Sequence, residues 1–245
     1  MDRVGYFVFS LLKNKLSNLL IFSYFLISLI EISAEFFKDN QIIWFTKPII
    51  IPLLVFYYWR VSKEPNKLFI IALLLNWFAN IFFIYQDYNN TLIGSLLFLG
   101  YRVLIIYIVM KIIKFPGFIP IIISSIPFLI AYMYFINLNF ESLDNGIYIF
   151  VLQGIFIIYL MAFAISNYMF KPNKLSIWLL LSSIFFITIQ FLVVLKLTYV
   201  YLNIFQPLAM VLFVIGQYLL VKFILLSEKK KVRYEIINGI KTNEV

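Results

Sequence analysis

Several strongly polar side chains stand inside the long apolar stretches of this sequence, and they are its candidates for chemistry. They are Glu31, Lys47, Asn76, Asn80, Arg102, Gln153, Gln190 and Gln217. The lipid interior offers such groups no water, so each must find a partner inside the protein or line a wet cavity. A buried arginine suits an anionic group such as a lipid phosphate, and an amide suits hydrogen bonds to a head group or to water.

The composition excludes several classes of function. The chain is 64% hydrophobic and 13% charged, whereas soluble domains carry about 25% charged residues. It has no cysteine and no histidine, which excludes thiol chemistry and Ser/His/Asp catalysis and removes the commonest metal ligand. We therefore expect no cofactor and no metal site. The net charge is +9, but the basic residues alternate with the apolar stretches, so we expect no nucleic acid partner.

Apolar runs of about 20 residues predict the elements that must position these side chains. The runs are about twice as long as a membrane-spanning β-strand and do not alternate in polarity, so they indicate helices. We predict an all-α, polytopic transmembrane helix bundle, with a single transmembrane domain over residues 1–226 and a basic tail over 227–245. The eight predicted spans cover residues 17–34, 42–59, 68–86, 91–110, 117–136, 147–167, 175–195 and 203–226.

The charges of the connecting loops predict the orientation. Lysine and arginine are concentrated in the loops that share a side with both termini. The loops on the other side hold Lys38, Lys196, Glu35, Asp39, Asp87, Glu141 and Asp144. The positive-inside rule then places both termini in the cytoplasm, and we expect a bacterial-type plasma membrane. The first apolar run shows no small-x-small cleavage site, so we expect an uncleaved helix. The tail is expected to be a frayed end near anionic lipid.

A short internal repeat suggests two four-helix halves. The sequence Pro-Asn-Lys-Leu at residues 65–68 recurs at residues 172–175, and each copy opens a span. The spans that follow contain the pairs Gly100-Tyr101 and Gly216-Gln217. Parallel halves of this kind occur in transporters. Chance repetition in a sequence of low diversity is the alternative.

Distances from the span midpoints predict the depth of the polar residues. At about 1.5 Å per residue, Arg102 lies within about 2 Å of the bilayer centre. On the same scale, a set of residues lies about 4 to 8 Å outward of the centre, namely Glu31, Lys47, Asn80, Gln153 and Gln190. We expect these side chains to converge on one polar pocket in the outer half of the bilayer.

Internal pairing is the structural alternative to a pocket. Glu31 would then neutralise Lys47 or Arg102, and the amides would bond across helices at about 0.6 kcal/mol each. The prolines Pro48 and Pro52 add a feature of their own, because a proline lacks the N–H that the preceding helical turn needs. We expect them to stiffen or kink the second span and to leave a backbone carbonyl available.

Two segments carry a resemblance to a known family. Thr46-Lys47-Pro48, followed by the apolar residues 49–54, resembles the Thr-Lys-Pro opening of the second span in the YhhN-like lysoplasmalogenase family. Residues 72–83 resemble the next span of that family, which ends in Gly-Asp, with Ala79-Asn80 at the matching place.

Two later segments extend the resemblance over residues 42–225, and the eight-span count agrees with the family. Residues 93–101 resemble the fourth span, in which a histidine usually stands at the position of Tyr101. Residues 186–192 resemble the Ser-Asp segment of the seventh span, with Ile189-Gln190 in register.

The resemblance implies an integral membrane hydrolase that cleaves the vinyl ether bond of lysoplasmalogens with two aspartates. This reaction needs protonation of the alkene carbon and attack of water on the oxocarbenium carbon, which suits one carboxylic acid and one carboxylate. Asn80 and Gln190 stand at the two acid positions, and an amide cannot donate and recover a proton at neutral pH. We expect the hydrolysis to be lost or strongly altered. The alternative is that an acid from a loop end, such as Asp87, enters the site.

The predicted site therefore resembles a lipid-binding pocket with degenerate catalytic positions. Asn80 and Gln190 would line the reacting end, and Lys47 and Arg102 would hold the phosphate. The remaining predicted binding residues are Tyr101, Glu31 and Gln153. The expected partner is a membrane lipid of the lysophospholipid type. A small transporter with a polar site at the membrane midplane is the alternative function.

Overall fold

A computed structural model describes residues 3–85, 87–138, 147–198 and 202–242, and every regular element in these ranges is an α-helix. The helices are α1 (Arg3–Phe37), α2 (Asn40–Val61), α3 (Lys67–Phe82), α4 (Tyr88–Ile112), α5 (Phe118–Leu138), α7 (Ile147–Phe170), α8 (Lys174–Thr198) and α9 (Phe205–Thr242). The predicted all-α bundle is confirmed. Two of the predicted loop acids, Glu141 and Asp144, lie outside the described residues.

Seven of these helices are long and apolar enough to cross a membrane, so the chain is a multi-pass integral membrane protein. Helix α3 is the exception, because its 16 residues rise only about 24 Å at 1.5 Å each, against a hydrocarbon core of about 30 Å. The predicted third span extended to residue 86, but the structure ends α3 at Phe82. A tight turn follows, in which the amide of Tyr85 donates to the carbonyl of Phe82 at 3.3 Å.

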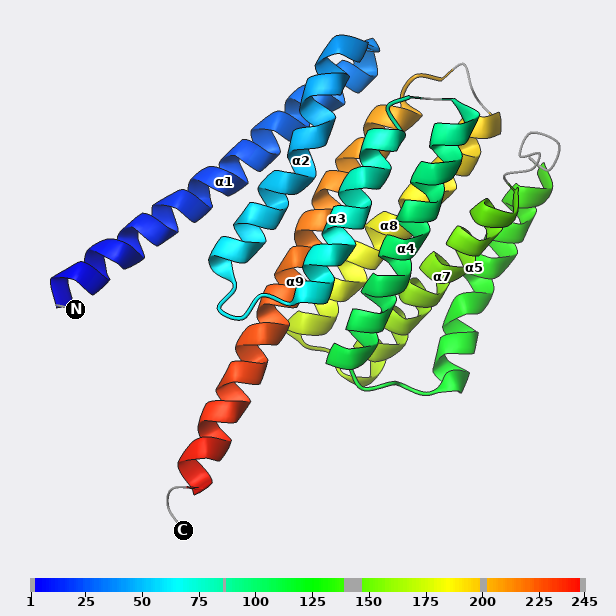
Figure 1. Ribbon diagram of the computed structural model, residues 1–245. Helices are drawn as coiled ribbons and strands as arrows, with labels where there is room; N and C mark the ends of the chain where they lie inside the picture. The colour runs from blue at the N-terminus through cyan, green and yellow to red at the C-terminus, as the bar shows by residue number, and fades with distance from the viewer. Residues whose placement is uncertain (1–2, 86, 139–146, 199–201, 243–245) are drawn as a thin grey trace.

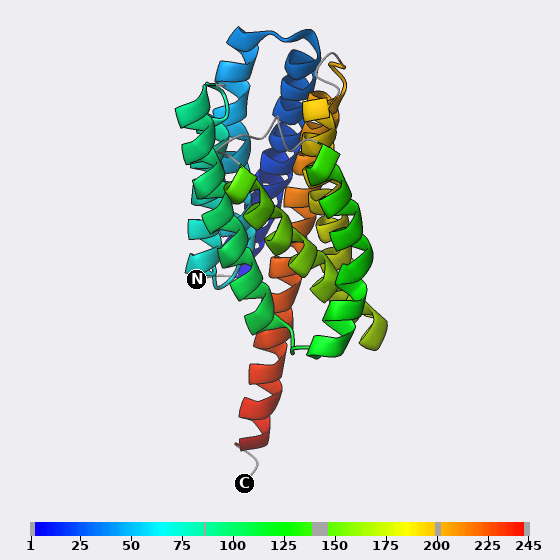
Figure 2. The ribbon, with the colours of Figure 1, turned by 90° about the vertical axis from the view of Figure 1, so that its right-hand side faces the viewer.

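The helices run alternately up and down, with both termini at the lower end of Figure 1. Helices α1 and α2 pack together at one side, and α3, α4 and α7 follow in turn. Helix α8 packs on α7, and α9 lies between α8 and the pair α1 and α2. Helix α5 covers the outside of α7 and α8. Helix α1 leans away from the bundle toward its N-terminus, and α9 continues beyond the lower ends of the other helices (Figures 1 and 2).

The C-terminal tail differs from the sequence prediction. We expected a frayed end after residue 226, but α9 continues without a break to Thr242. The basic run from Lys229 therefore stands on a projecting helix and not on a loose segment. The physical reason lies in the composition, because Lys, Glu, Arg and Ile residues without proline sustain a helix that the membrane span has already nucleated.

Asparagine N-caps explain the repeated Pro-Asn-Lys-Leu sequence locally. The side chain of Asn66 accepts from the amide nitrogens of Leu68 and Phe69, at 3.0 and 3.3 Å, and begins α3. Asn173 does the same for α8, where it accepts from the amide of Leu175 at 2.9 Å. Both caps satisfy backbone donors that a helix start leaves free.

Contacts between the predicted halves agree with the repeat beyond these caps. In two related halves, α4 corresponds to α9 and α2 corresponds to α7. The last helix of each half packs on the second helix of the other half, because α4 packs on α7 and α9 packs on α2. The second glycine-polar pair also meets the first, because Tyr101 and Gln217 are hydrogen bonded to each other. Equivalent residues that contact one another lie on the axis relating two copies. The packing of α1 on α9 has no comparable counterpart between α5 and α4 among the described residues, so the choice between related halves and chance repetition stays open.

The two prolines of α2 leave a carbonyl free, as the sequence predicts. Pro52 lacks the N–H that would bond to the carbonyl of Pro48 one turn earlier. That carbonyl instead accepts from the indole N–H of Trp77 on α3, at 2.7 Å. The freed group thus joins α2 to α3, and α2 remains one helix.

Candidate functional site

Arg102 lies near the middle of α4, inside the bundle, and is only 6% exposed. Its Nη1 donates to the backbone carbonyl of Gln153 on α7 at 2.6 Å, and its Nη2 donates to Oε1 of Gln190 on α8 at 2.9 Å. The guanidinium also stands over the ring of Phe98, with Cζ 4.8 Å from the ring centroid. The arginine therefore ties α4 to both α7 and α8 through neutral acceptors.

A second layer of hydrogen bonds holds the two glutamines. The side chain of Gln153 donates to the carbonyl of Ser95 at 2.8 Å. Gln190 donates to the hydroxyl of Tyr132 on α5 at 3.3 Å, and Tyr132 in turn donates to the carbonyl of Phe150 at 2.7 Å. These bonds fix the orientation of the two glutamines around the arginine, because each side-chain amide donor has a partner.

Gly154 makes the position of Tyr132 possible. A Cβ atom at residue 154 would lie 2.1 Å from two carbon atoms of the Tyr132 ring. The tyrosine thus packs directly on the backbone of α7, where any side chain would displace it. The glycine is therefore part of the support for Gln190 and, through it, for Arg102.

The charge of Arg102 has no carboxylate partner among the residues whose side chains the structure describes, because the ion pairs found there belong to Lys47. An arginine near the bilayer centre costs about 2.5 kcal/mol or more on insertion scales. A cavity of about 20 Å³ adjoins the guanidinium, lined by Phe98, Tyr101, Arg102, Ile105, Ile157, Leu160, Phe186 and Ile189. This space suits about one water molecule.

A separate cluster of charged residues lies between α1 and α2. The ammonium of Lys47 stands 2.6 Å from Oε1 of Glu35 and 3.7 Å from Oε1 of Glu31. The hydroxyl of Thr46 contacts Oε2 of Glu31 and also lies 2.8 Å from the carbonyl of Ile42. Lys47 is 6% exposed, and Glu31 is fully buried.

Glu35 corrects the sequence interpretation, which placed it in a loop outside the membrane. The structure buries Glu35 at 9% exposure, on the same face of α1 as Glu31 and one turn further on. The pairing of Glu31 with Lys47 that we considered as the structural alternative is present. Because carboxyl groups surround Lys47, its expected role as a phosphate ligand is not supported by its neighbours.

Asn80 lies in a third position, close to the upper end of α3. Its Nδ2 donates to the backbone carbonyl of Asn76 at 2.8 Å and to the Asn76 side-chain oxygen at 3.0 Å. Nδ2 of Asn76 is buried and has no hydrogen-bond partner among the described residues. These contacts are local to α3, so they satisfy the amide of Asn80 without joining it to Gln190.

Tyr101 and Gln217 form a fourth contact across the bundle. The tyrosine hydroxyl lies 3.1 Å from Oε1 and 3.0 Å from Nε2 of the glutamine, and both residues are buried. Tyr101 also lines the small cavity beside Arg102. It is therefore the predicted site residue that shares a cavity with the arginine.

The predicted residues thus form several groups and not the single pocket that we expected. Arg102, Gln153 and Gln190 are joined by hydrogen bonds, and Tyr101 lies beside them at the cavity. The other three predicted residues stand apart: among the described side chains, no contact joins Glu31, Lys47 or Asn80 to the arginine group. Depth predicted from the sequence gives the height of a side chain along its helix, but not the direction in which it points.

Asp87 does not enter the bundle. It is exposed and begins α4 as its N-cap, where it accepts from the backbone amide of Asn90 at 3.1 Å and from its side-chain amide at 2.6 Å. These hydrogen bonds, the side-chain one first, hold the pKa of Asp87 below its ordinary value. The alternative in which this acid replaces a lost catalytic aspartate is therefore wrong.

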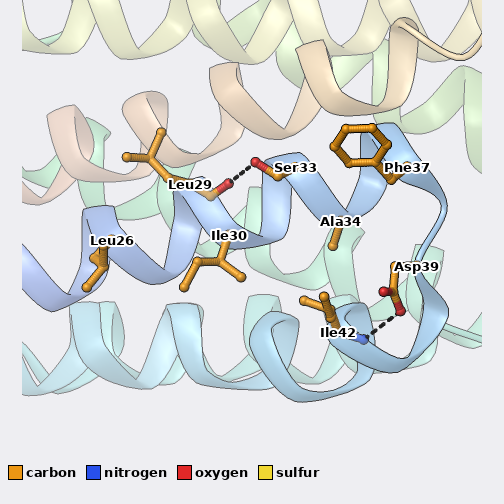
Figure 3. Close-up of a pocket in the computed structure, with 8 residues that line it drawn as sticks. All are labelled: Leu26, Leu29, Ile30, Ser33, Ala34, Phe37, Asp39 and Ile42. Atoms are coloured by element: carbon orange, nitrogen blue, oxygen red, sulfur yellow. Dashed lines mark hydrogen bonds between the residues drawn. The ribbon is translucent and has the colours of Figure 1, made fainter.

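A larger groove of about 420 Å³ opens between α1 and α2 near their connection (Figure 3). It is lined by Leu26, Leu29, Ile30, Ser33, Ala34, Phe37, Asp39 and Ile42. Its polar groups are already bonded, because Ser33 donates to the carbonyl of Leu29 at 2.9 Å and Asp39 accepts from the amide of Ile42 at 3.2 Å. The groove holds none of the predicted site residues and presents a mostly hydrocarbon wall.

Lys222 is a charged residue that the sequence reasoning missed, although it falls within the last predicted span. It is half-buried in α9 and donates to the hydroxyl of Tyr57 at 2.9 Å. Its ammonium lies 4.9 Å from the ring centroid of Tyr218 and 5.5 Å from that of Tyr57. The sequence could have identified this residue, because Lys222 is a charged side chain inside the apolar run 203–226.

Comparison with known proteins agrees with the suspected family. The sequence matches the YhhN family over residues 42–224, which is more than half of the chain. No curated protein and no solved structure gives a significant match. The matched range begins after α1 and includes Lys47, Arg102 and both amide positions, Asn80 and Gln190. Together with the membrane-spanning bundle, this match shows that the chain belongs to the YhhN family.

Proposed function

We propose that this YhhN protein binds a lysophospholipid-type membrane lipid through the anionic head group of that lipid, with Arg102 as the principal ligand. The observation that carries the proposal is the buried guanidinium held by neutral acceptors alone among the described residues. Such a cation gains most from an anion that enters the bundle, because the low dielectric constant there strengthens the attraction between the two charges. A phosphate group accepts two parallel hydrogen bonds from a guanidinium.

We further propose that the vinyl ether hydrolysis of lysoplasmalogens is lost or strongly altered. Asn80 hydrogen bonds within α3, and Gln190 is an acceptor for Arg102. Neither amide supplies the proton that the alkene carbon requires. The orientation of the chain belongs to the same proposal: the lower end in Figure 1, with both termini, faces the cytoplasm because the basic loops gather there.

Lipid entry requires some separation of the helices around Arg102. The adjoining cavity of about 20 Å³ has room for about one water molecule, so a phosphate group needs more space than the cavity offers. Side chains of α4, α7 and α8 form the wall, including Ile105 and Ile157. Substitution of Ile157 by Phe would fill this space and is expected to weaken binding without a change of charge.

Retention of a lysophospholipid by the purified protein in native mass spectrometry tests the binding proposal. Arg102→Gln should abolish retention of the anionic lipid, and Ile157→Phe should reduce it. Lys222→Gln is the matched control, because Lys222 is also a cation within a span but is held between tyrosines. Equal retention by wild type and Arg102→Gln would contradict the proposal.

Release of a fatty aldehyde from lysoplasmalogen tests the catalytic part separately. The unmodified protein should give no aldehyde above background. The double variant Asn80→Asp and Gln190→Asp restores both acids, and activity gained only in that variant would support a degenerate site. Substantial activity of the unmodified protein would overturn the proposed loss of catalysis while leaving the binding result intact.

A further inference from the structure

The cluster between α1 and α2 contains one positive and two potentially negative groups. Glu31 and Glu35 stand one helical turn apart on α1, and both face the ammonium of Lys47 on α2. With both carboxyl groups ionised, the cluster would carry one uncompensated negative charge inside the bundle. With one proton bound, it is neutral. Buried charges in a low-dielectric interior are stable only when they are paired and hydrogen bonded.

Among the residues whose side chains the structure describes, charged groups on the surrounding helices do not supply the missing positive charge by direct contact. Helix α1 packs against α2 and α9, and Lys47 is the charged residue that α2 places here. Lys196, at the upper end of α8, is near enough to interact with Glu35 and Lys47 electrostatically. Its ammonium is exposed and donates to Oε1 of Gln206 on α9 at 2.9 Å, so it is not an ion-pair partner of Glu35 among the described residues.

The hydrogen bonds of Thr46 point to the place of a proton. Its Oγ1 is within hydrogen-bond distance of two acceptors, the carbonyl of Ile42 and Oε2 of Glu31. A hydroxyl group has one hydrogen to donate, and it also accepts. If Thr46 donates to Ile42, the contact with Glu31 needs a hydrogen from the carboxyl group. A protonated Glu31 completes a continuous chain of donors and acceptors from Glu31 through Thr46 to Ile42.

The other oxygen of Glu31 supports the same assignment. Oε1 is buried, has no hydrogen-bond partner among the described residues, and lies 3.7 Å from Nζ of Lys47. The lysine instead donates to Glu35 at 2.6 Å, a short distance of the kind that an ammonium makes with a carboxylate. An oxygen without a donor is costly for a carboxylate but much less so for the carbonyl of a neutral carboxylic acid.

We propose that the cluster is a proton-binding site, in which Glu31 carries an exchangeable proton on Oε2 while Glu35 and Lys47 form the ion pair. The bound species is a proton from solution, which adds to a carboxylate oxygen to form the carboxylic acid. Glu35 lies two residues before the end of α1 and is slightly exposed, so the cluster is close to the upper surface. The chain therefore holds an acid–base group on a helix outside the matched family range. This inference does not depend on lipid binding at Arg102.

Infrared spectroscopy of the full chain in lipid nanodiscs tests the proposal through the C=O stretch of protonated carboxyl groups. Wild type at neutral pH should show this band, and carbon-13 labelling of glutamate, but not of aspartate, should shift it. Glu31→Gln should abolish the band. Thr46→Val should shift the band to the frequency of a carboxylic acid without a hydrogen bond, because the acceptor is lost.

Glu228→Gln is the matched control. Glu228 accepts from Ser62 at 2.6 Å and from Tyr58, both at the other end of the bundle, so its removal should leave the band unchanged. Absence of a glutamate-dependent band in wild type overturns the proposal even if no variant folds. Persistence of the band in Glu31→Gln also overturns it. Stabilisation of wild type by sodium ions without the band would assign the missing charge to a metal cation and contradict the proton.

Discussion

The substitution of Gln190 by Glu tests the electrostatics around Arg102 most sharply. The new carboxylate would stand where the amide oxygen now accepts from Nη2 at 2.9 Å. Gln217→Glu is the matched control, because that glutamine is also buried in a span but its partner is Tyr101. We expect the same chemical change to have very different effects on the free energy of unfolding at the two positions.

The magnitudes follow from three contributions. Transfer of a carboxylate to the middle of a span costs about 3 kcal/mol on insertion scales at either position. Loss of the amide donor costs about 0.6 kcal/mol at either position, as expected for polar pairs in membrane proteins. Only at residue 190 does the substituted side chain contact an arginine. The attraction between the new carboxylate and the guanidinium, at about 4 Å and an effective dielectric constant near 20, stabilises the variant by about 4 kcal/mol.

Gln190→Glu is therefore expected to be nearly neutral, whereas Gln217→Glu should destabilise the protein by about 3.6 kcal/mol, the sum of the first two contributions. If the new carboxyl group at residue 217 is accommodated in its protonated form, the difference falls to about 2 kcal/mol but keeps its sign. Reversible unfolding of both variants in mixed micelles measures the difference. Equal destabilisation at the two positions would refute the assignment of an uncompensated charge to Arg102. Gln190→Glu should also weaken lipid retention, because the new carboxylate forms an ion pair with the guanidinium of Arg102 in place of the lipid phosphate.

Three further predictions concern the supports of the site and of the helices around it. Gly154→Ala should cost about 1–3 kcal/mol of unfolding free energy, because its Cβ would lie 2.1 Å from the ring of Tyr132; calorimetry of the variant checks this, and an unchanged melting temperature would contradict the close approach. Trp77→Phe should cost about 1 kcal/mol by removing the donor to the carbonyl that Pro52 leaves free, and Pro52→Ala in the same chain should recover part of the loss, measured by a double-mutant cycle. The pKa of Asp87 is lowered in the folded state, so its carboxylate stabilises the start of α4 at pH values above the ordinary carboxyl pKa and loses this effect as the pH falls through the lowered pKa. Hydrogen exchange of the amides in the first turn of α4 should therefore accelerate as the pH falls through this range. The same acceleration should not occur in Asp87→Asn.

The helices were predictable because a single physical property decides them. An apolar run of about 20 residues without alternation has no other stable form in lipid. The ends were less predictable, as α3 shows. Its apolar run continues past Phe82, but the turn after Phe82 and the cap at Asp87 end it early. Local turn and cap hydrogen bonds compete with extension of the helix, and the hydropathy of an apolar run does not predict the residue at which the helix ends.

The side-chain partners were predictable only where sequence spacing carries direction. Glu31 and Glu35 are four residues apart and therefore share one face of a helix, a signal that was available but was overruled by the loop assignment. The bond from Arg102 to Gln190 had no such signal, because the two residues belong to helices whose rotation about their axes is set by packing. Asn80 illustrates the same limit, since its similar predicted depth did not bring it to Gln190.

The distance from Arg102 to a lipid phosphorus atom tests the central proposal most directly. Solid-state NMR can measure it as the dipolar dephasing of arginine Cζ, labelled with carbon-13, by the phosphorus of a lysophospholipid bound to the protein in a membrane. The proposal predicts dephasing from one buried arginine. The dephasing should disappear in Arg102→Lys and persist in Arg60→Lys, because Arg60 stands in the last turn of α2 and not beside the cavity. Identical dephasing in wild type and Arg102→Lys would contradict the binding of an anionic head group at Arg102.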